Sequence, residues 1–302
     1  MKWILLLLLI SCASEVADLP DRDLPDLPNR DLPDRELPDL PDRDLPDREL
    51  PDEQEPSVGE SLTLTNPTSG VDIEAMFFDA GSDHTVILVQ GGTGHMASFQ
   101  TGKGPNPSMV DRVTEAGYNA LIFNPDGRGK SGGVEDYNGH IGQDALYAVY
   151  EYAESKGSVG IASFSYGVAL ASGMLGRYDV SPAYYIEWEG PVDRYYVTVN
   201  CTGGAVREGV TCDDDEYWSE REAITYVKDW NIDTFIVVQG MKDHVQPSWQ
   251  HTIDMNNEAI KYIDYVQMNS NTPNIEHTEE TVVPINNIEK ENFVIEKISE
   301  LL

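Results

Sequence analysis

The chain has 302 residues and a formal net charge of −33 at pH 7, because 53 Asp and Glu residues outnumber 20 Lys and Arg residues. This excess of carboxylates argues against nucleic acid, or an anionic lipid surface, as the partner that carries the substrate. Behind two unusual N-terminal segments, residues 57–302 have the length expected of one large α/β domain.

The N-terminus has the pattern of a secretion signal. A basic start, Met1-Lys2-Trp3, precedes the aliphatic run from Ile4 to Ile10, which is too short to span a bilayer. The residues Leu9-Ile10-Ser11-Cys12 resemble the bacterial lipobox. We therefore predict a lipoprotein signal peptide over residues 1–12, a lipid on Cys12, and an extracytoplasmic, membrane-anchored protein in the periplasm or at the cell surface. An ordinary secretory signal cleaved nearby is the alternative.

Residues 13–56 repeat the motif Asp-Leu-Pro-Asp-Arg with small variations and contain 16 acidic and 5 basic residues. Proline every three to five residues forbids a helix and favours extended polyproline II backbone. A single Leu in each repeat cannot build a core, so the segment is predicted to be a disordered, self-repelling spacer. An array of binding motifs for a partner protein is the alternative.

The folded domain begins with strands expected near 61–65, 71–78 and 84–89. The third of these ends in Gln90-Gly91-Gly92-Thr93-Gly94, and His95 follows. Glycines let the backbone turn sharply and leave N–H groups unshielded by side chains. A helix over 108–116, a strand over 119–123 and a helix over 141–155 are expected next. This alternation is typical of a βαβ arrangement.

A strand predicted over 158–163 runs into Ser163-Phe164-Ser165-Tyr166-Gly167, and a small, apolar helix-like stretch follows to about Met174. Such a small-x-Ser-x-Gly turn places a hydroxyl at the exposed end of a strand, although the first small residue is usually Gly. The following helix N-terminus directs N–H groups at any anion that forms nearby. Ser165 is therefore the candidate nucleophile, and the N–H groups of Gly92 and Tyr166 are the candidate oxyanion hole.

Three further stretches carry a family resemblance. Strands expected at 183–188 and 234–238 precede Gly240-Met241-Lys242-Asp243, and a strand at 262–268 precedes a polar loop with His277. The loop Asp126-x-Arg128-Gly129-x-Ser131 resembles the D-x-R-G-x-G-x-S loop of the α/β-hydrolase superfamily, although no glycine stands at Lys130 or Ser131. The resemblance covers residues 58–302, and it implies that Asp126 and Arg128 are structural.

The resemblance also implies a catalytic triad in the family's chain order, Ser165, Asp243 and His277. In this triad Ser165 attacks an acyl carbonyl, His277 transfers the proton, and Asp243 fixes the imidazole. The other histidines are less well placed in the sequence. In particular, His244 lies beside the acid but after the wrong strand, and His251 lies inside a predicted helix.

The fold expected from these elements is α/β: a mostly parallel sheet of about eight strands, with helices on both faces and a small cap insertion at about 190–230. The cap contains Cys201 and Cys212, whose spacing favours a disulfide over two buried thiols. It also contains the acidic run 213–216, interpreted as a helix start with a calcium site as the alternative, and a helix over 218–228. No metal and no cofactor are predicted.

The segment Glu187-Trp188-Glu189 ends a strand and should border the substrate pocket, together with His95. Either glutamate could bind a substrate amine, as in an aminopeptidase, whereas Trp188 could line an apolar pocket; plain packing is the third interpretation. We expect a serine hydrolase that cleaves a small-molecule ester or amide, with an ester preferred. A serine peptidase with the same triad, or an inactive binding protein on the same scaffold, is the alternative.

Overall fold

The computed structural model describes residues 58–102, 107–197, 201, 203–246 and 248–302. The predicted signal peptide, Cys12 and the repeat segment 13–56 lie outside these residues. Residues Gln54–Leu302 form one compact unit, to which every described residue belongs. In the described part of the chain, no helix is long and apolar enough to cross a membrane.

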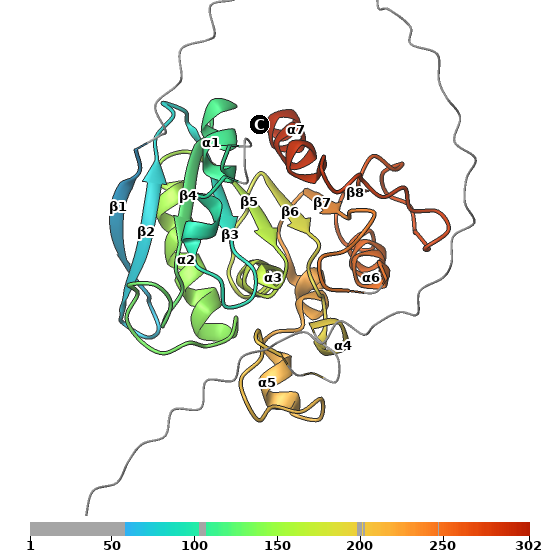
Figure 1. Cartoon of the computed structure of the whole chain (residues 1–302), viewed down its shortest axis with the longest axis horizontal. Coiled ribbons are helices and arrows are strands. Elements are labelled where there is room, and N and C mark those ends of the chain that lie inside the picture. Colours follow the sequence, from blue (N-terminus) through green and yellow to red (C-terminus); the bar gives the residue numbers. More distant parts are fainter. Residues whose placement is uncertain (1–57, 103–106, 198–200, 202, 247) are drawn as a thin grey trace, which may run out of the picture. The chain divides into compact units, whose positions relative to one another are not determined.

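Within the described residues, the strands form one eight-stranded sheet in the order β1-β2-β4-β3-β5-β6-β7-β8 (Figure 1). The six strands β4, β3, β5, β6, β7 and β8 pair in parallel, and β1 and β2 complete the sheet through antiparallel pairs. The strands are β1 Glu60–Thr65, β2 Asp72–Phe78, β3 His84–Val89, β4 Asn119–Phe123, β5 Ser158–Phe164, β6 Tyr184–Trp188, β7 Thr234–Val238 and β8 Tyr265–Met268.

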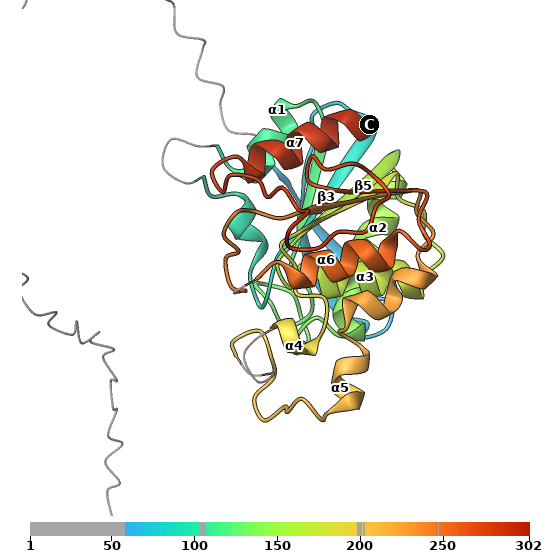
Figure 2. The ribbon, with the colours of Figure 1, turned by 90° about the vertical axis from the view of Figure 1, so that its right-hand side faces the viewer.

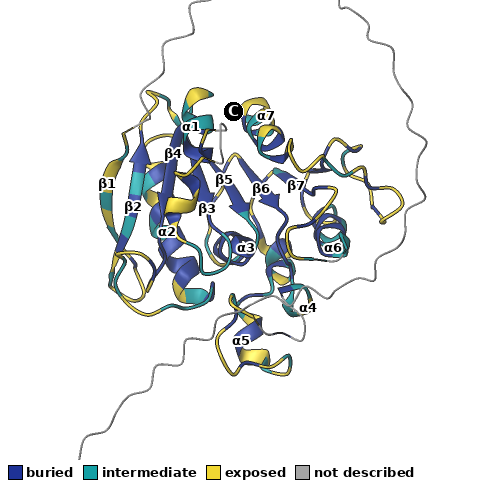
Figure 3. Cartoon of the chain, in the orientation of Figure 1, coloured by how far each residue is buried: buried dark blue, intermediate teal, exposed yellow. Residues whose placement is uncertain are grey.

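Helices cover both faces of the sheet, as predicted, because the central strands are apolar on both sides. In β7, Phe235 and Val237 belong to one buried cluster, whereas Ile236 and Val238 belong to the other. Figure 2 shows α1 and α7 on one side and α2, α3 and α6 on the other, and Figure 3 shows the buried strands between them. The helices are α1 Met109–Glu115, α2 His140–Glu154, α3 Gly167–Arg177, α6 Gln250–Ala259 and α7 Lys290–Leu301.

The cap insertion contains α4 (Arg194–Val197), α5 (Asp215–Ser219) and a 3₁₀ segment, η3 (Ala223–Asp229). The acidic run starts a helix, since the Asp214 side chain accepts a hydrogen bond from Tyr217 N. The predicted continuous helix over 218–228 is wrong. The α-helix α5 ends at Ser219, and after residues 220–222 the chain continues as the 3₁₀ segment η3, which contains the β-branched residues Ile224, Thr225 and Val227 of low helix propensity. Cys201 and Cys212 form a disulfide with a Cα–Cα distance of 5.2 Å.

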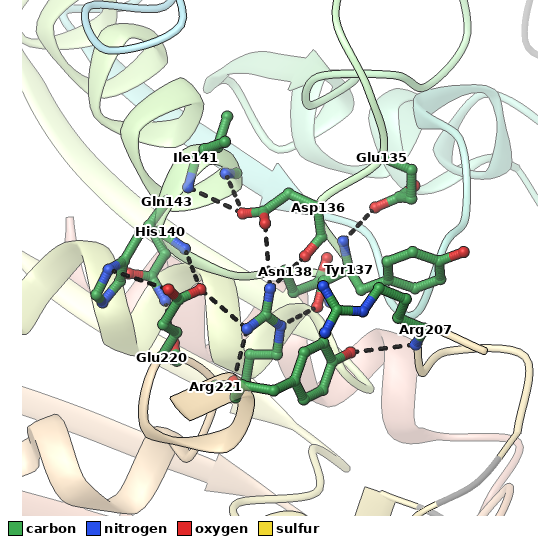
Figure 4. Close-up of polar contacts among 12 residues, drawn as sticks. Glu135, Asp136, Tyr137, Asn138, His140, Ile141, Gln143, Arg207, Glu220 and Arg221 are labelled. Atoms are coloured by element: carbon green, nitrogen blue, oxygen red, sulfur yellow. Dashed lines mark hydrogen bonds and ion pairs between the residues drawn. The ribbon is translucent and has the colours of Figure 1, made fainter. Parts of the chain in front are cut away.

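Arg221 ties the cap to the loop before α2, as Figure 4 shows. Its guanidinium donates to the backbone carbonyls of Tyr137 at 3.0 Å and Asp136 at 2.6 Å, and it forms an ion pair with the Asp136 carboxylate at 3.1 Å. It also lies 3.9 Å from the ring centroid of Tyr217. Because Arg221 is only 4% exposed, these contacts form a buried anchor for the cap.

Candidate active site

Ser165 sits on a sharp turn between β5 and α3, as predicted. Its φ of 53° lies in the left-handed region, which is strained for a residue with a side chain. Two glycines make room for this turn. A Cβ on Gly91 would lie 2.5 Å from Ser165 Cβ, and a Cβ on Gly167 would lie 2.6 Å from the Gln90 carbonyl oxygen. The strained turn therefore depends on the glycine loop after β3 as well as on its own sequence.

The imidazole beside Ser165 belongs to His244. Its Nε2 lies 2.7 Å from Ser165 Oγ, which is hydrogen-bond distance. His244 lies in the loop after β7, and its side chain is 29% exposed, so a substrate can reach it. The ring also packs against Phe164, at 4.9 Å between ring centroids.

The prediction that His277 provides this imidazole is wrong. His277 lies in the loop after β8, where its backbone N–H donates to Asn257 Oδ1 at 2.8 Å and its carbonyl accepts from Asn257 Nδ2 at 2.9 Å. Its ring Nδ1 lies 3.5 Å from Thr281 Oγ1. These contacts hold the loop against α6, and burial lowers the pKa of His277. His277 is thus a buried residue of the loop that packs on α6, and within the described residues its ring Nε2 has no hydrogen-bond partner.

Two carboxylates face the other ring nitrogen of His244. Nδ1 lies 3.3 Å from Glu189 Oε2 and 3.5 Å from Asp243 Oδ1. Negative charge on this side favours the tautomer that carries its proton on Nδ1, which leaves Nε2 free to accept the hydroxyl proton of Ser165. Asp243 thus lies beside the His244 ring, and Glu189 lies beside it as well.

Glu189 is held more tightly than a substrate-binding residue would be. It is 1% exposed, Gly240 N–H donates to its Oε1 at 3.0 Å, and Lys290 Nζ donates to its Oε2 at 2.6 Å. Its φ of 51° is a second left-handed value, directly after β6. Strain at a buried, charged residue points to a functional constraint. Its predicted alternative role, binding a substrate amine, is not supported, because both carboxylate oxygens are already engaged.

Asp243 anchors the loop that carries His244. Its Oδ1 accepts the backbone N–H groups of Val245 at 2.8 Å and Gln246 at 2.7 Å, and its Oδ2 lies 3.2 Å from His251 Nε2. Burial alone would raise the pKa of Asp243, but the hydrogen bonds from His251 and the two backbone groups outweigh it and hold that pKa well below its usual range. Asp243 therefore stays ionised beside the imidazole.

A small pocket of about 140 Å³ lies beside the Ser165 turn, and its lining includes Ser165, His244, Gly92 and Tyr166. Within the described ranges, the backbone N–H groups of Gly92 and Tyr166 donate to no other group. Both residues thus lie at the pocket beside Ser165, and their role as an oxyanion hole stays a prediction. His95, in contrast, is exposed at the start of the 3₁₀ segment η1 (Met96–Phe99) and does not line this pocket.

The loop that carried the family resemblance is structural, as predicted. Arg128 is 2% exposed and forms an ion pair with Glu135 at 2.7 Å, and it donates to Asn138 Oδ1 at 2.5 Å. Asn138 Nδ2 in turn donates to the carbonyl of Tyr166 at 2.8 Å. Through Asn138, Arg128 therefore stabilises the backbone of the turn that carries Ser165.

Glu189, Asp243 and His244 also form the one group of potential metal ligands in the described part of the chain, with ligand atoms within 4.8 Å of one another. Lys290 Nζ already neutralises Glu189 at 2.6 Å. A metal on His244 Nδ1 would also force the proton onto Nε2, so the imidazole could no longer act as a base towards Ser165. The arrangement fits proton transfer better than metal binding.

Comparison with known proteins finds similar folds but no similar sequence. No family model matches the chain, and no curated protein sequence matches it significantly. Solved structures do match. The esterase Pf2001 of Pyrococcus furiosus is 18% identical, with a TM-score of 0.59 over 82% of this chain and 92% of its own. Est1E from Butyrivibrio proteoclasticus, solved with ferulic acid bound, is 15% identical, with a TM-score of 0.52 over 79% and 99%.

A third match is the acylaminoacyl peptidase of Pyrococcus horikoshii, which is 12% identical with a TM-score of 0.53 over 72% of this chain and 37% of that protein. At these identities the likeness concerns the fold. The strand order, the helices on both faces and these neighbours agree, and the chain therefore has the α/β-hydrolase fold.

Proposed function

We propose that the protein is a serine hydrolase that cleaves an ester through an acyl-serine intermediate. The observation that carries the proposal is the 2.7 Å contact between Ser165 Oγ and His244 Nε2. A serine hydroxyl is a weak nucleophile near neutral pH and needs an adjacent base, which this contact supplies. Behind the base, Glu189 and Asp243 hold the imidazole and stabilise its protonated form.

The proposed reaction has two half-reactions. Ser165 Oγ attacks the ester carbonyl carbon while His244 Nε2 takes the hydroxyl proton, and the N–H groups of Gly92 and Tyr166 stabilise the oxyanion. The C–O bond to the alcohol then breaks, and His244 returns the proton to the departing oxygen. In the second half, His244 takes a proton from water, the hydroxide attacks the acyl-serine, and Ser165 leaves with the proton.

A serine peptidase with the same residues is the second candidate, since an acylaminoacyl peptidase is among the structural neighbours. Cleavage next to a free amino terminus would require an acidic group that can reach the substrate amine. Glu187 is 0% exposed and Glu189 is 1% exposed and paired with Lys290, so neither is available for this role. This burial favours an ester over an aminopeptidase substrate.

The test uses a fluorophosphonate probe and p-nitrophenyl acetate with three variants. Ser165→Ala should abolish labelling, and Ser165→Ala and His244→Ala should each lower kcat by about 10³-fold or more. His277→Ala is the matched control, and it should retain kcat. Activity that survives in His244→Ala but disappears in the soluble, folded His277→Ala variant would refute the assignment. Absence of both labelling and turnover in the wild type would favour an inactive binding protein.

We further propose that the enzyme acts outside the cytoplasm, anchored through a lipid on Cys12. The Cys201–Cys212 disulfide supports this, because such bonds persist mainly in oxidising compartments. Several buried acyl chains, at ~0.8 kcal/mol per CH₂, would make a durable anchor. Cys12→Ser should move the protein from the membrane fraction to the soluble fraction of cells that process bacterial lipoproteins. An unchanged distribution would contradict the anchor.

A further inference from the structure

Two pockets meet at the ring of His244. The smaller, of about 140 Å³, contains Ser165 and the candidate oxyanion hole and is closed by the small cap side chains of Val197 and Ala205. The larger, of about 300 Å³, is lined by His244 but not by Ser165. Its other apolar walls come from η1, α1 and the ends of β5 and β6: Phe99, Met109, Phe164 and Trp188.

The chemistry of the proposed reaction assigns one part of the substrate to each pocket. The acyl carbon must bond to Ser165 while its oxygen reaches the N–H groups of Gly92 and Tyr166, so the acyl group belongs in the smaller pocket. The departing oxygen must come within hydrogen-bond reach of His244, which protonates it. The larger pocket begins at His244, so the alcohol part of the ester belongs there.

The sizes of the two pockets limit both parts. Pockets for small molecules usually measure about 300–1,000 Å³. The acyl pocket, at about 140 Å³, lies well below this range and fits only a short acyl chain. The alcohol pocket, at about 300 Å³, lies at the lower end and fits a single ring.

The walls of the alcohol pocket match an aromatic ring. Phe164 packs edge-to-face against Trp188 with ring centroids 4.9 Å apart, and its other neighbour is the ring of His244 at 4.9 Å. Aromatic groups prefer this kind of surrounding over plain aliphatic packing. The charged residues of the lining are Glu189, Lys290 and Glu291, and the first two neutralise each other. The only Lys or Arg among the described lining residues, Lys290, already pairs with Glu189, so the pocket offers no free ammonium or guanidinium group to a negatively charged alcohol.

We infer that the preferred substrate is an ester of a short acyl group with an aromatic alcohol that carries no negative charge, whose ring occupies the pocket between Phe164, Trp188 and His244. This inference rests on the proposed function. It adds a substrate class and a specificity pocket to the catalytic contact.

The test compares benzyl acetate with methyl acetate, which share the acyl group and have alcohols of similar acidity. Wild-type kcat/KM should favour benzyl acetate by about 10–200-fold, the range for filling an apolar subsite. Benzyl octanoate should be a poorer substrate than benzyl acetate, because the acyl pocket is small. Equal rates for benzyl and methyl acetate, or a preference for the octanoate, would overturn the inference.

Two tryptophan variants on one short helix separate the pocket from a general effect. Ser98 is exposed and lines the alcohol pocket, whereas Ala97 is exposed and does not line it. Ser98→Trp should lower the benzyl-to-methyl ratio of kcat/KM by about tenfold or more, and Ala97→Trp should leave it unchanged. An equal effect of both variants would contradict the assignment. Labelling of Ser165 by a fluorophosphonate tests the proposed function independently of the alcohol pocket. Loss of labelling in the wild type would contradict the proposed function, whereas normal labelling without a preference for benzyl acetate would contradict only the pocket assignment.

Discussion

Glu187 provides a quantitative test of the electrostatics around the site. It lies in β6, is fully buried, and accepts a hydrogen bond from Gly190 N–H at 2.7 Å through Oε1. Within the described residues its Oε2 has no hydrogen-bond partner. Burial raises the pKa of Glu187 to about 8; the Gly190 hydrogen bond opposes this rise, whereas the charges of Asp243 and Glu189 add to it. The perturbation is Glu187→Gln, which keeps the acceptor for Gly190 and removes the titration.

The magnitude follows from the difference between the folded and unfolded pKa values. With an unfolded pKa of 4.5 and a folded pKa of about 8, the carboxyl is protonated in both states below pH 4.5 and costs nothing. Between these values the unfolded chain loses the proton and the folded chain keeps it, so the free energy of unfolding falls as the pH rises. Above pH 8 the loss levels off at about 4–5 kcal/mol.

The assay is urea unfolding of the wild type and Glu187→Gln at pH 5 and pH 8.5. The difference in free energy of unfolding between the variant and the wild type should grow by about 3–4 kcal/mol between these pH values, because only the wild type contains the buried group that titrates. Glu279→Gln, at an exposed position, is the control and should show no such growth. A difference between wild type and Glu187→Gln that stays constant with pH would refute the reasoning.

Two further predictions concern the acid and the cap. Glu189→Gln should lower kcat by about 10²–10⁴-fold with a small change in KM, because the imidazole loses a charged partner that steadies its protonated form; unchanged steady-state kinetics would leave Asp243 as the sole acid. Replacing Cys201 and Cys212 together by Ser should lower the free energy of unfolding by about 2–3 kcal/mol, as measured in urea without reductant, because the disulfide closes a short loop. A stability equal to that of the wild type would show that the disulfide does not restrain the unfolded cap.

The sheet could be predicted closely because its strands are continuous apolar runs bounded by turn-forming residues. The strands β3, β4 and β7 occupy 84–89, 119–123 and 234–238, as the sequence indicated. A strand buried on both faces needs such a run, and few other local structures tolerate one. The Ser165 turn could be predicted equally well, because it lies so close to the loop after β3 that only small residues and glycines fit there.

The imidazole beside Ser165 could not be predicted in the same way, because the order of residues along the chain does not give the distances between them. In the sheet, β6 alone separates β7 from β5. Neighbouring strands lie about 4.8 Å apart, so the end of β7 is about 10 Å from the end of β5, while the end of β8 is about 14 Å away. A side chain in the loop after β7 can therefore reach Ser165 more easily than one after β8. The available signal was His244 itself, which directly follows Asp243 in the loop after the buried strand β7.

Glu189 could be placed near the site from the sequence, but its ion pair could not be predicted, since its partner lies far away in the sequence. Lys290 is 101 positions downstream, at the first turn of α7, and the packing of α7 on the sheet brings its ammonium group to Glu189. The pair is buried, so either charge alone would be strongly destabilising. The ammonium group also neutralises part of the negative charge that would otherwise gather where β6 and β7 end.

The three carboxyl groups at this edge of the sheet thus have three different environments. Glu187 lacks a cation and stays protonated, Glu189 has Lys290, and Asp243 has His251 and two backbone N–H groups. If all three carboxyl groups were ionised without partners, their mutual repulsion in a buried site would exceed their attraction to the protonated imidazole. Because Glu189 and Asp243 each have their own partners, both can carry a negative charge beside the ring of His244. In the proposed reaction these two charges stabilise the protonated imidazole that forms when Ser165 attacks.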